Sequence, residues 1–286
     1  MTVREFKVLF YTKLTVLYPK NEVDIFFALI TEEYLAISPV DVIVNPTNII
    51  SQDTLHRLEK VTQRLLREEP IQYILGKTEF YGLPFYVNKN TLIPRPETEE
   101  LVDWIIEENK QQDSISILDI GTGSGCIPIA LKKNLTTSNI CAIDVSEKAL
   151  EIAKKNMASN NVNIEWLAID ILRTEQLPKK FDIIVSNPPY VRQLEKNEMK
   201  KNVLENEPHL ALFVTDNNPL IFYSKIADLA KRSLTKNGML FFEINQYLAE
   251  EMLAMMKNKG YTNIELRKDF RGNDRMIKAS YLSDEL

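Results

Sequence analysis

From about residue 115 onward, short runs of apolar and β-branched residues alternate with helical patterns, and this alternation limits the fold more than any other feature. The predicted strands are SISILDI, NICAID, NIEWLAID, FDIIVS, GMLFFEI, YTNIELRK and DRMIKAS. Strand–helix alternation predicts a mostly parallel sheet with helices on both faces. Only residues 269–273 separate the last two strands, which is too short for a parallel crossover, so these two should form an antiparallel hairpin.

Residues 1–75 contain no strand pattern and predict a small helical domain. The expected apolar stripes are Phe6, Leu9, Phe10, Leu14 and Leu17 in the first helix, and Leu55, Leu58, Thr62, Leu65 and Leu66 in the third. Residues 76–95 place Gly82, Pro84 and Pro94 among aromatic and β-branched residues, which predicts a hairpin connector. Pro96 then begins a helix at the start of a second domain, residues 96–286.

A glycine loop, Gly121-Thr122-Gly123-Ser124-Gly125, joins the first strand of the alternating region to its first helix. Glycine lets the backbone approach a ligand closely and adopt positive φ, and a helix N-terminus offers free N–H groups. Asp144 ends the next strand, about 20 residues further on, where nucleoside-binding folds place the acid that binds ribose. Capping the helix at Ser146 is the alternative role for Asp144. The loop predicts a cofactor that contains a nucleoside.

The spacing of the loop indicates which nucleoside this is. A dinucleotide fingerprint has G-x-G-x-x-G or Ala, whereas this loop has G-x-G-x-G and Cys126 in the last position. Asp119, just before the loop, would repel phosphate but could attract a cation. S-adenosylmethionine, with its sulfonium, amino acid part and ribose, suits these residues better than NAD. Asp170, at the end of the third strand, could hold an adenine amino group or simply cap the strand end.

The fourth strand leads directly into Asn187-Pro188-Pro189-Tyr190, which should lie beside the glycine loop at the carboxyl edge of the sheet. A planar NH2 group is a poor nucleophile because its lone pair is delocalised, so an acceptor on each N–H would orient it towards a methyl donor. The Asn187 side chain and the Pro188 carbonyl can be those acceptors, proline stiffens the backbone, and Tyr190 can stack on the flat group. We therefore predict methyl transfer to an amide or amino nitrogen; a proline-rich turn with an asparagine cap is the alternative.

Composition narrows the range of partners. The net charge is −5 and the pI about 5.4, whereas nucleic-acid binders more often carry a basic face, so no direct nucleic-acid partner is expected. Cys126 and Cys141 have neither metal spacing nor a disulfide framework, which predicts no metal site and fits a reducing cytosol. We expect a cytoplasmic protein without a membrane partner, since neither a signal-peptide core nor a membrane-length apolar stretch is present.

The segments ILDIGTGSGCIPIAL, AIDVSEKALEIAKKN and DIIVSNPPYV resemble class I S-adenosylmethionine methyltransferases that act on amino groups. The whole chain resembles the HemK/PrmC protein-glutamine N5-methyltransferases of peptide chain release factors. This resemblance is most specific in PIQYILGKTEFYGLPFYVNKNTLIPRPETEELV and continues in ENEPHLALF, GMLFFEINQ and DFRGNDR. It implies an α/β fold: a Rossmann-like, seven-stranded, mostly parallel sheet with one antiparallel strand, preceded by a small all-α N-terminal domain.

The resemblance also implies a reaction and its residues. The reaction methylates the glutamine of the Gly-Gly-Gln motif in release factors and leaves S-adenosylhomocysteine, and residues 1–75 would recognise the substrate. The implied cofactor-binding residues are Asp119, Gly121, Thr122, Gly123, Ser124, Gly125, Asp144, Asp170, Ile171 and Asn187. Asn187 and Pro188 would be catalytic, and with Pro189 and Tyr190 they would hold the substrate glutamine. Two departures are visible: Asn206 replaces an aromatic residue before Glu207-Pro208, and Pro128 replaces a commoner alanine.

Three alternatives need weighing. An adenine N6-methyltransferase would use the same motif with a flipped base stacked on Tyr190, but it should bring a basic surface, and residues 1–75 hold eight Lys/Arg against ten Asp/Glu. A ribosomal-protein glutamine methyltransferase would share all the motifs. The intact loop, acid and Asn-Pro-Pro-Tyr set argues against a non-catalytic cofactor-binding or adaptor protein.

Overall fold

The computed structural model describes residues 1–281 and divides into two compact units. One unit comprises Met1–Gly76 together with Lys200–Asn206, and the other comprises Lys77–Met199 together with the chain from Glu207 onward. The sequence places the first boundary at residue 75 and assigns residues 200–206 to the second domain. In the structure this short segment instead clusters with the helical unit, where Lys201 forms an ion pair of 3.0 Å with Glu68.

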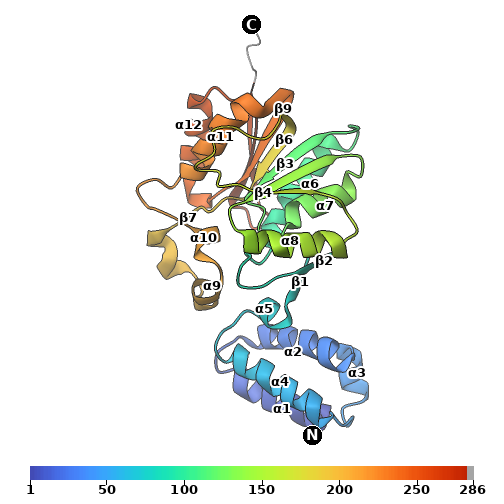
Figure 1. The fold of residues 1–286 in the computed structure, drawn as a ribbon. Helices are drawn as coiled ribbons and strands as arrows, with labels where there is room; N and C mark the ends of the chain where they lie inside the picture. The colour runs from blue at the N-terminus through green and yellow to red at the C-terminus, as the bar shows by residue number, and fades with distance from the viewer. Residues whose placement is uncertain (282–286) are drawn as a thin grey trace. The chain divides into compact units, whose positions relative to one another are not determined.

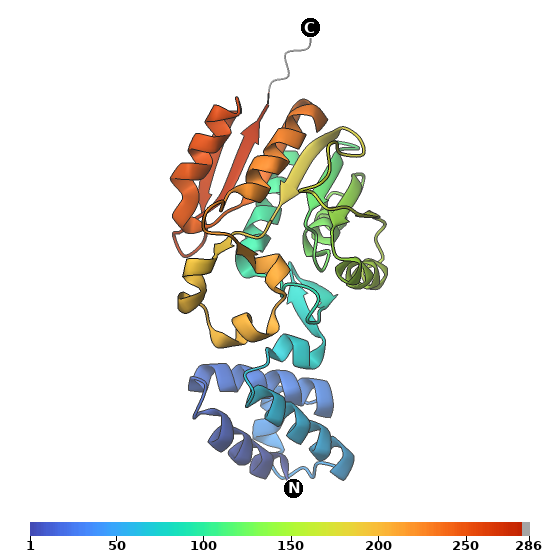
Figure 2. The ribbon, with the colours of Figure 1, turned by 60° about the vertical axis from the view of Figure 1, so that its left-hand side comes forward.

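Most of the first unit consists of helices that pack around an apolar core, to which α9, its last short helix, contributes no buried side chain (Figure 2). Its helices are α1 (Val3–Leu14), α2 (Lys20–Leu35), α3 (Pro39–Val44), α4 (Gln52–Leu65), α5 (Ile71–Leu75) and α9 (Lys201–Asn206). Thr2 and Ser38 form capping boxes at α1 and α3, and Ser51 caps α4, so side chains satisfy the free N–H groups at these helix starts. The helical reading of this region is therefore confirmed.

Two of the residues predicted for the apolar stripes, Leu9 and Leu17, lie outside this core, and Leu66 packs against it without being fully buried. Helix α1 ends at Leu14, and Leu17 is 48% exposed in the turn that leads to Pro19. Leu66 is the C-cap of α4 and only half-buried, whereas Val61 is buried. The helical period locates the buried face correctly, but it carries no information about where the helix ends.

The second unit begins with the expected hairpin. Strands β1 (Lys77–Phe80) and β2 (Leu83–Tyr86) pair antiparallel, and the turn between them holds Tyr81 and Gly82 at φ of 51° and 69°. Phe80 and Phe85 pack edge to face, with ring centroids 6.0 Å apart, and join a core cluster of this unit. The hairpin is thereby fixed to the body that follows it.

A seven-stranded sheet, in the order β10-β11-β9-β6-β3-β4-β5, forms the body of the second unit. The strands are β3 (Ser116–Ile120), β4 (Asn139–Asp144), β5 (Glu165–Ala168), β6 (Phe181–Ser186), β9 (Leu234–Glu243), β10 (Thr262–Lys268) and β11 (Asp274–Ser280). The pairs from β9 to β5 are parallel, and β11 is antiparallel to both of its neighbours. This arrangement confirms the predicted class I methyltransferase sheet and its C-terminal hairpin.

Helices cover both faces of the sheet (Figure 1). One face carries α6 (Pro96–Asn109), α7 (Cys126–Asn134) and α8 (Glu147–Ser159), and the other carries α11 (Ile221–Ser233) and α12 (Ala249–Asn258). Successive strand residues serve opposite faces: Ile117 belongs to the core under α6 and α7, and Leu118 to the core under α11. Such double coverage explains why these strands are apolar throughout rather than alternating.

Short elements follow β6 and β9 at the carboxyl edge of the sheet. They are β7 (Val191–Arg192), η1 (Gln193–Glu198), α10 (His209–Leu212), β8 (Phe213–Val214) and η2 (Gln246–Leu248). The buried Glu195 carboxylate accepts from the Asn245 side chain at 3.0 Å and pairs with Arg192, which ties η1 to the end of β9. None of the helices in residues 1–281 has the length and apolar character needed to cross a membrane.

Candidate active site

Pairing between the central strands brings the glycine loop and Asn187 to the same edge of the sheet. Strand β3 pairs with β6 in a register that places Ile120 opposite Ser186, the residues just before Gly121 and Asn187. Strand β4 flanks β3 on the other side, with Ile143 opposite Ile120. The two motifs predicted to lie side by side therefore do so.

The three glycines of the loop have different roles, although all adopt positive φ, at 77°, 56° and 79°. A Cβ built on Gly121 or Gly123 would meet nothing within 4 Å, so these two leave open space beside the backbone. A Cβ on Gly125 would lie 2.9 Å from Trp166 Cη2 and 3.1 Å from Ala153 Cβ. Gly125 therefore makes room for the packing of the protein itself.

Asp144 lies in the wall of a cavity, and its carboxylate binds backbone N–H groups of two neighbouring loops rather than those of the first turn of α8. Its Oδ2 accepts from the Gly123 N–H and its Oδ1 from the Ser146 N–H, both at 2.8 Å. Burial raises the pKa of this carboxyl, and the backbone donors oppose that rise. Asp144 thus fixes the loop to the start of α8, where Ser146 is the N-cap as predicted.

A cavity of about 320 Å³ opens at this edge of the sheet. Six of the predicted cofactor residues line it: Gly121, Gly123, Asp144, Asp170, Ile171 and Asn187. The other four, Asp119, Thr122, Ser124 and Gly125, do not belong to the lining. Ser124 is buried and its backbone carbonyl accepts from the Asn156 side chain at 2.9 Å, so its observed role is structural.

The residues behind the loop leave polar atoms without partners. Both oxygens of Asp119 and the Thr122 hydroxyl are buried and have no hydrogen-bond partner among the described residues. Burial, together with the nearby Asp144 carboxylate, raises the pKa of Asp119 to about 7. Unsatisfied buried polar groups are rare in native proteins and mark missing ligands or water. Together with the open space at Gly121 and Gly123, they fit the cationic amino acid part of S-adenosylmethionine.

A second, smaller cavity of about 50 Å³ adjoins the first. Its wall includes Arg95, Tyr190 and Leu212, and it shares Leu92, Asn187, Pro188 and Ala211 with the larger cavity. Asn187 and Pro188 thus lie in the wall of both. A group in the small cavity and a ligand in the large one would meet at these two residues.

The side chains of Asn187 and Tyr190 are bound to a buried polar pair. Asn187 Nδ2 donates to Thr98 Oγ1 at 3.2 Å, and Tyr190 donates to Glu243 Oε1 at 2.9 Å. The Thr98 hydroxyl donates to Glu243 Oε2 at 2.6 Å. Sequence reasoning assigned no role to Thr98 or Glu243, although TLIPRPETEE and GMLFFEINQ, which contain them, belong to the family-specific segments.

Arg95 and Glu207 form an ion pair beside the small cavity, with Nη2 and Oε1 2.6 Å apart. Glu207 is 4% exposed, and its Oε2 also accepts from the Ile93 N–H at 3.3 Å.

The two departures from the family pattern are accommodated: Asn206 donates to the Asn202 carbonyl at 2.9 Å. Pro128 is the third residue of α7, where a backbone N–H has no intrahelical partner to lose.

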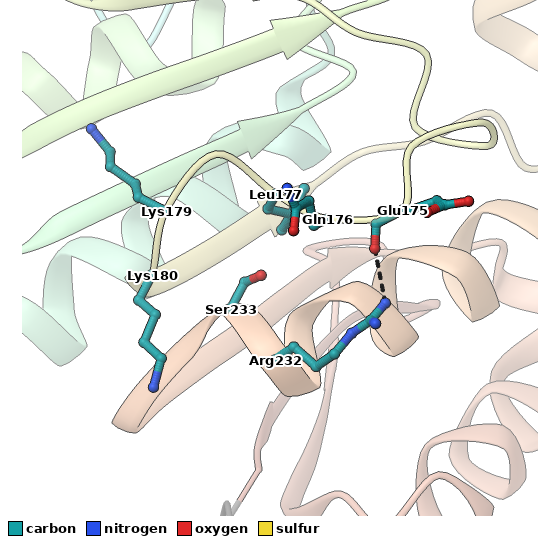
Figure 3. A pocket seen from close by; sticks show the side chains of 7 residues that line it. All are labelled: Glu175, Gln176, Leu177, Lys179, Lys180, Arg232 and Ser233. Atoms are coloured by element: carbon teal, nitrogen blue, oxygen red, sulfur yellow. Dashed lines mark hydrogen bonds between the residues drawn. The ribbon is translucent and has the colours of Figure 1, made fainter.

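A further hollow, of about 520 Å³, lies elsewhere on the second unit (Figure 3). Its lining comes from the residues that lead into β6 and β9, so it lies at the amino edge of the sheet. Lys179 and Lys180 point away from Arg232, which donates to the Glu175 carbonyl at 2.9 Å. No convergent polar groups mark it as a site.

In residues 1–281, no group of three or more His, Cys, Asp or Glu could hold a metal ion.

The sheet, the glycine loop and the double cavity define a methyltransferase of class I architecture. The methyltransferase small domain family matches residues 100–212, and the PrmC N-terminal domain family matches residues 18–76. The release factor glutamine methyltransferase of Flavobacterium psychrophilum is 52% identical over 98% of this chain and 100% of its own length. The enzyme of the same name from Bacteroides thetaiotaomicron is 44% identical over 92% and 95%. The chain belongs to the release factor glutamine methyltransferase family.

A solved structure extends the likeness of fold to more distant proteins. The crystal structure of the hMettl16 catalytic domain in complex with MAT2A 3′UTR hairpin 6 has a TM-score of 0.58. It covers 82% of this chain and 84% of its own, at 17% sequence identity. At that identity the likeness concerns the fold alone.

Proposed function

We propose that this enzyme transfers a methyl group from S-adenosylmethionine to the side-chain amide nitrogen of the glutamine in the Gly-Gly-Gln motif of peptide chain release factors. The observation that carries the proposal is the place of Asn187 and Pro188 in the wall of two adjoining cavities. The large cavity suits the cofactor and the small one a single side chain. The names of the full-length relatives support the choice of release factors as substrate.

Asn187 and Pro188 would hold the reacting nitrogen. Within residues 1–281, Asn187 Oδ1 has no hydrogen-bond donor, so it can accept one N–H of the glutamine amide while the Pro188 carbonyl accepts the other. Tyr190 would stack on the amide from the small cavity. When bound, S-adenosylmethionine supplies an electrophilic methyl group on its sulfonium. Holding the nitrogen in line with that methyl accounts for catalysis by orientation, and the methylated amide then loses a proton to water.

The cofactor would lie along the wall of the large cavity. Gly121 and Gly123 would accept the methionine part closely, and Asp144 would bind the ribose with the lone pairs that its two backbone donors leave free. Asp170 and Ile171 would border the adenine, because they follow β5 on the far side of β4.

The helical unit, residues 1–75 in the sequence-based division, would recognise the substrate protein. Motifs cannot separate release factors from ribosomal proteins, because both offer a glutamine amide to the same cavity. The adenine alternative would need the small cavity, about 50 Å³, to accept a base. A single amide suits that volume better.

Labelled S-adenosylmethionine tests the proposal. The enzyme is incubated with it and with release factors, ribosomal proteins or DNA in separate reactions, and the label is located by mass spectrometry. We expect label on the release factor at the Gly-Gly-Gln glutamine, and none when that glutamine is changed to alanine. Label on a ribosomal protein or on DNA, with the release factor unlabelled, would overturn the proposal.

A further inference from the structure

The orientation of the Asn187 amide decides whether this side chain presents an acceptor or a donor to the substrate. Its oxygen and nitrogen have nearly the same shape, so the cavity alone does not select between them. Asn187 Nδ2 lies 3.2 Å from Thr98 Oγ1, and that hydroxyl lies 2.6 Å from Glu243 Oε2. Thr98 and Glu243 are 3% and 1% exposed, so water does not compete for these bonds.

The number of hydrogens available in this series of hydrogen bonds decides the orientation of the Asn187 amide. A threonine hydroxyl has one hydrogen, and Thr98 donates it in the hydrogen bond to the Glu243 carboxylate. Burial raises the pKa of Glu243, and the Thr98 and Tyr190 hydroxyls and the charge of Arg275 oppose that rise. With Glu243 ionised, the Thr98 oxygen can only accept, so Asn187 must turn its NH2 group towards it. A flipped amide would place two oxygens against each other. The carbonyl oxygen of Asn187 is thereby left for the cavity.

We propose that Thr98 and Glu243 are positioning residues that lock the Asn187 amide with its carbonyl oxygen facing the reacting nitrogen. The proposal rests on the proposed function and adds to it the groups that set the geometry of the acceptor. Neither Thr98 nor Glu243 lines the two cavities, so both act through Asn187.

One carboxylate also couples the acceptor to the wall of the small cavity. Glu243 Oε1 accepts from the Tyr190 hydroxyl at 2.9 Å, and the backbone carbonyl of Glu243 accepts from Tyr223 at 3.0 Å. Thr98 lies in the first turn of α6, Glu243 ends β9, and Asn187 and Tyr190 follow β6. Helix α6 and the residues after β6 therefore meet at Glu243 on β9, which binds Tyr190 directly and Asn187 through Thr98.

The test compares variants of Thr98. In Thr98→Val the shape is kept and the acceptor is lost, so kcat on the release factor should fall about tenfold, as for loss of one hydrogen bond, while affinity for S-adenosylhomocysteine stays unchanged. Thr98→Ser keeps the hydroxyl and should restore most of the rate. Thr235→Val is the matched control, because Thr235 donates to the Asp182 carboxylate at 2.8 Å near the opposite edge of the sheet; its kcat should equal that of the wild type.

A double-mutant cycle separates positioning from general structural damage. Thr98→Val should reduce kcat no further when Asn187 is already alanine, because its effect passes through that side chain. An independent readout is the side-chain NH2 resonance of Asn187, assigned by its loss in Asn187→Ala. This resonance should shift in Thr98→Val and stay in place in Thr98→Ser and Thr235→Val.

Several results would overturn the inference: additive losses in the cycle, equal losses in Thr98→Val and Thr98→Ser, or an Asn187 resonance that Thr98→Val leaves in place. If the wild type does not methylate release factors, the proposed function fails, and the resonance still decides the role of Thr98.

Discussion

Asn187 is the residue on which the proposed chemistry depends. Replacing it by alanine removes the acceptor for one substrate N–H, which costs about 1–3 kcal/mol for the unpaired donor, and lost alignment adds to that. We expect Asn187→Ala to lower kcat by about 10²-fold or more while affinity for S-adenosylhomocysteine, measured by calorimetry, stays near that of the wild type. Asn134→Ala, on the exposed side of α7, is the control. A variant with wild-type turnover would remove Asn187 from the reaction.

Asp119 gives a prediction about pH. Its pKa is raised from 3.8 in the unfolded chain to about 7 in the folded protein, mainly by burial. Between pH 3.8 and pH 7 the folded protein therefore binds more protons than the unfolded chain. The free energy of unfolding therefore falls as the pH rises through this window, by about 4 kcal/mol at most. In Asp119→Asn this dependence disappears, so the variant should gain stability relative to the wild type between pH 4 and pH 8, and it should bind S-adenosylhomocysteine more weakly.

Urea unfolding of the unliganded proteins at pH 4, 6 and 8 measures this difference, with the exposed Asp113→Asn as control. Parallel pH profiles for the wild type and Asp119→Asn would show that the buried carboxyl does not titrate in this range.

At the scale of elements, two glycines differ in what they are needed for. Gly125 at the start of α7 is needed for packing, whereas Gly272, between β10 and β11, is needed only for its backbone conformation. Gly125 and Gly272 both have positive φ, at 79° and 86°. A Cβ would press against Trp166 and Ala153 at Gly125 and meet nothing at Gly272. Left-handed backbone costs about 1–2 kcal/mol for alanine, and overpacking adds about 1–3. Gly125→Ala should therefore unfold at a lower urea concentration than Gly272→Ala; equal midpoints would contradict the packing role.

The sequence predicts the elements of the second unit well because each is a local pattern. The strands, the glycine turn and the terminal hairpin follow from periodicity and loop length, and strand pairing then brings Gly121 and Asn187 together. Thr98 and Glu243 could not be found this way, since 145 residues separate them and no period links them. The packing role of Gly125 depends on Trp166 in β5, about 40 residues further along the chain, so a local pattern cannot predict it.

At the scale of the whole molecule, the two units suggest two parts of substrate recognition. If the second unit binds only the glutamine and its neighbours while the helical unit binds the rest of the protein, a short Gly-Gly-Gln peptide should be methylated with a KM well above that of an intact release factor. The KM for S-adenosylmethionine should be the same with both substrates. Equal KM values for peptide and protein would assign recognition to the second unit alone.

The most direct test of the account is a crystal structure of the enzyme with S-adenosylhomocysteine and a Gly-Gly-Gln peptide. The account predicts the glutamine nitrogen about 3 Å from both Asn187 Oδ1 and the Pro188 carbonyl, with the cofactor sulfur on the open side of that nitrogen. A glutamine bound elsewhere, or an Asn187 side chain turned away from it, would contradict the account.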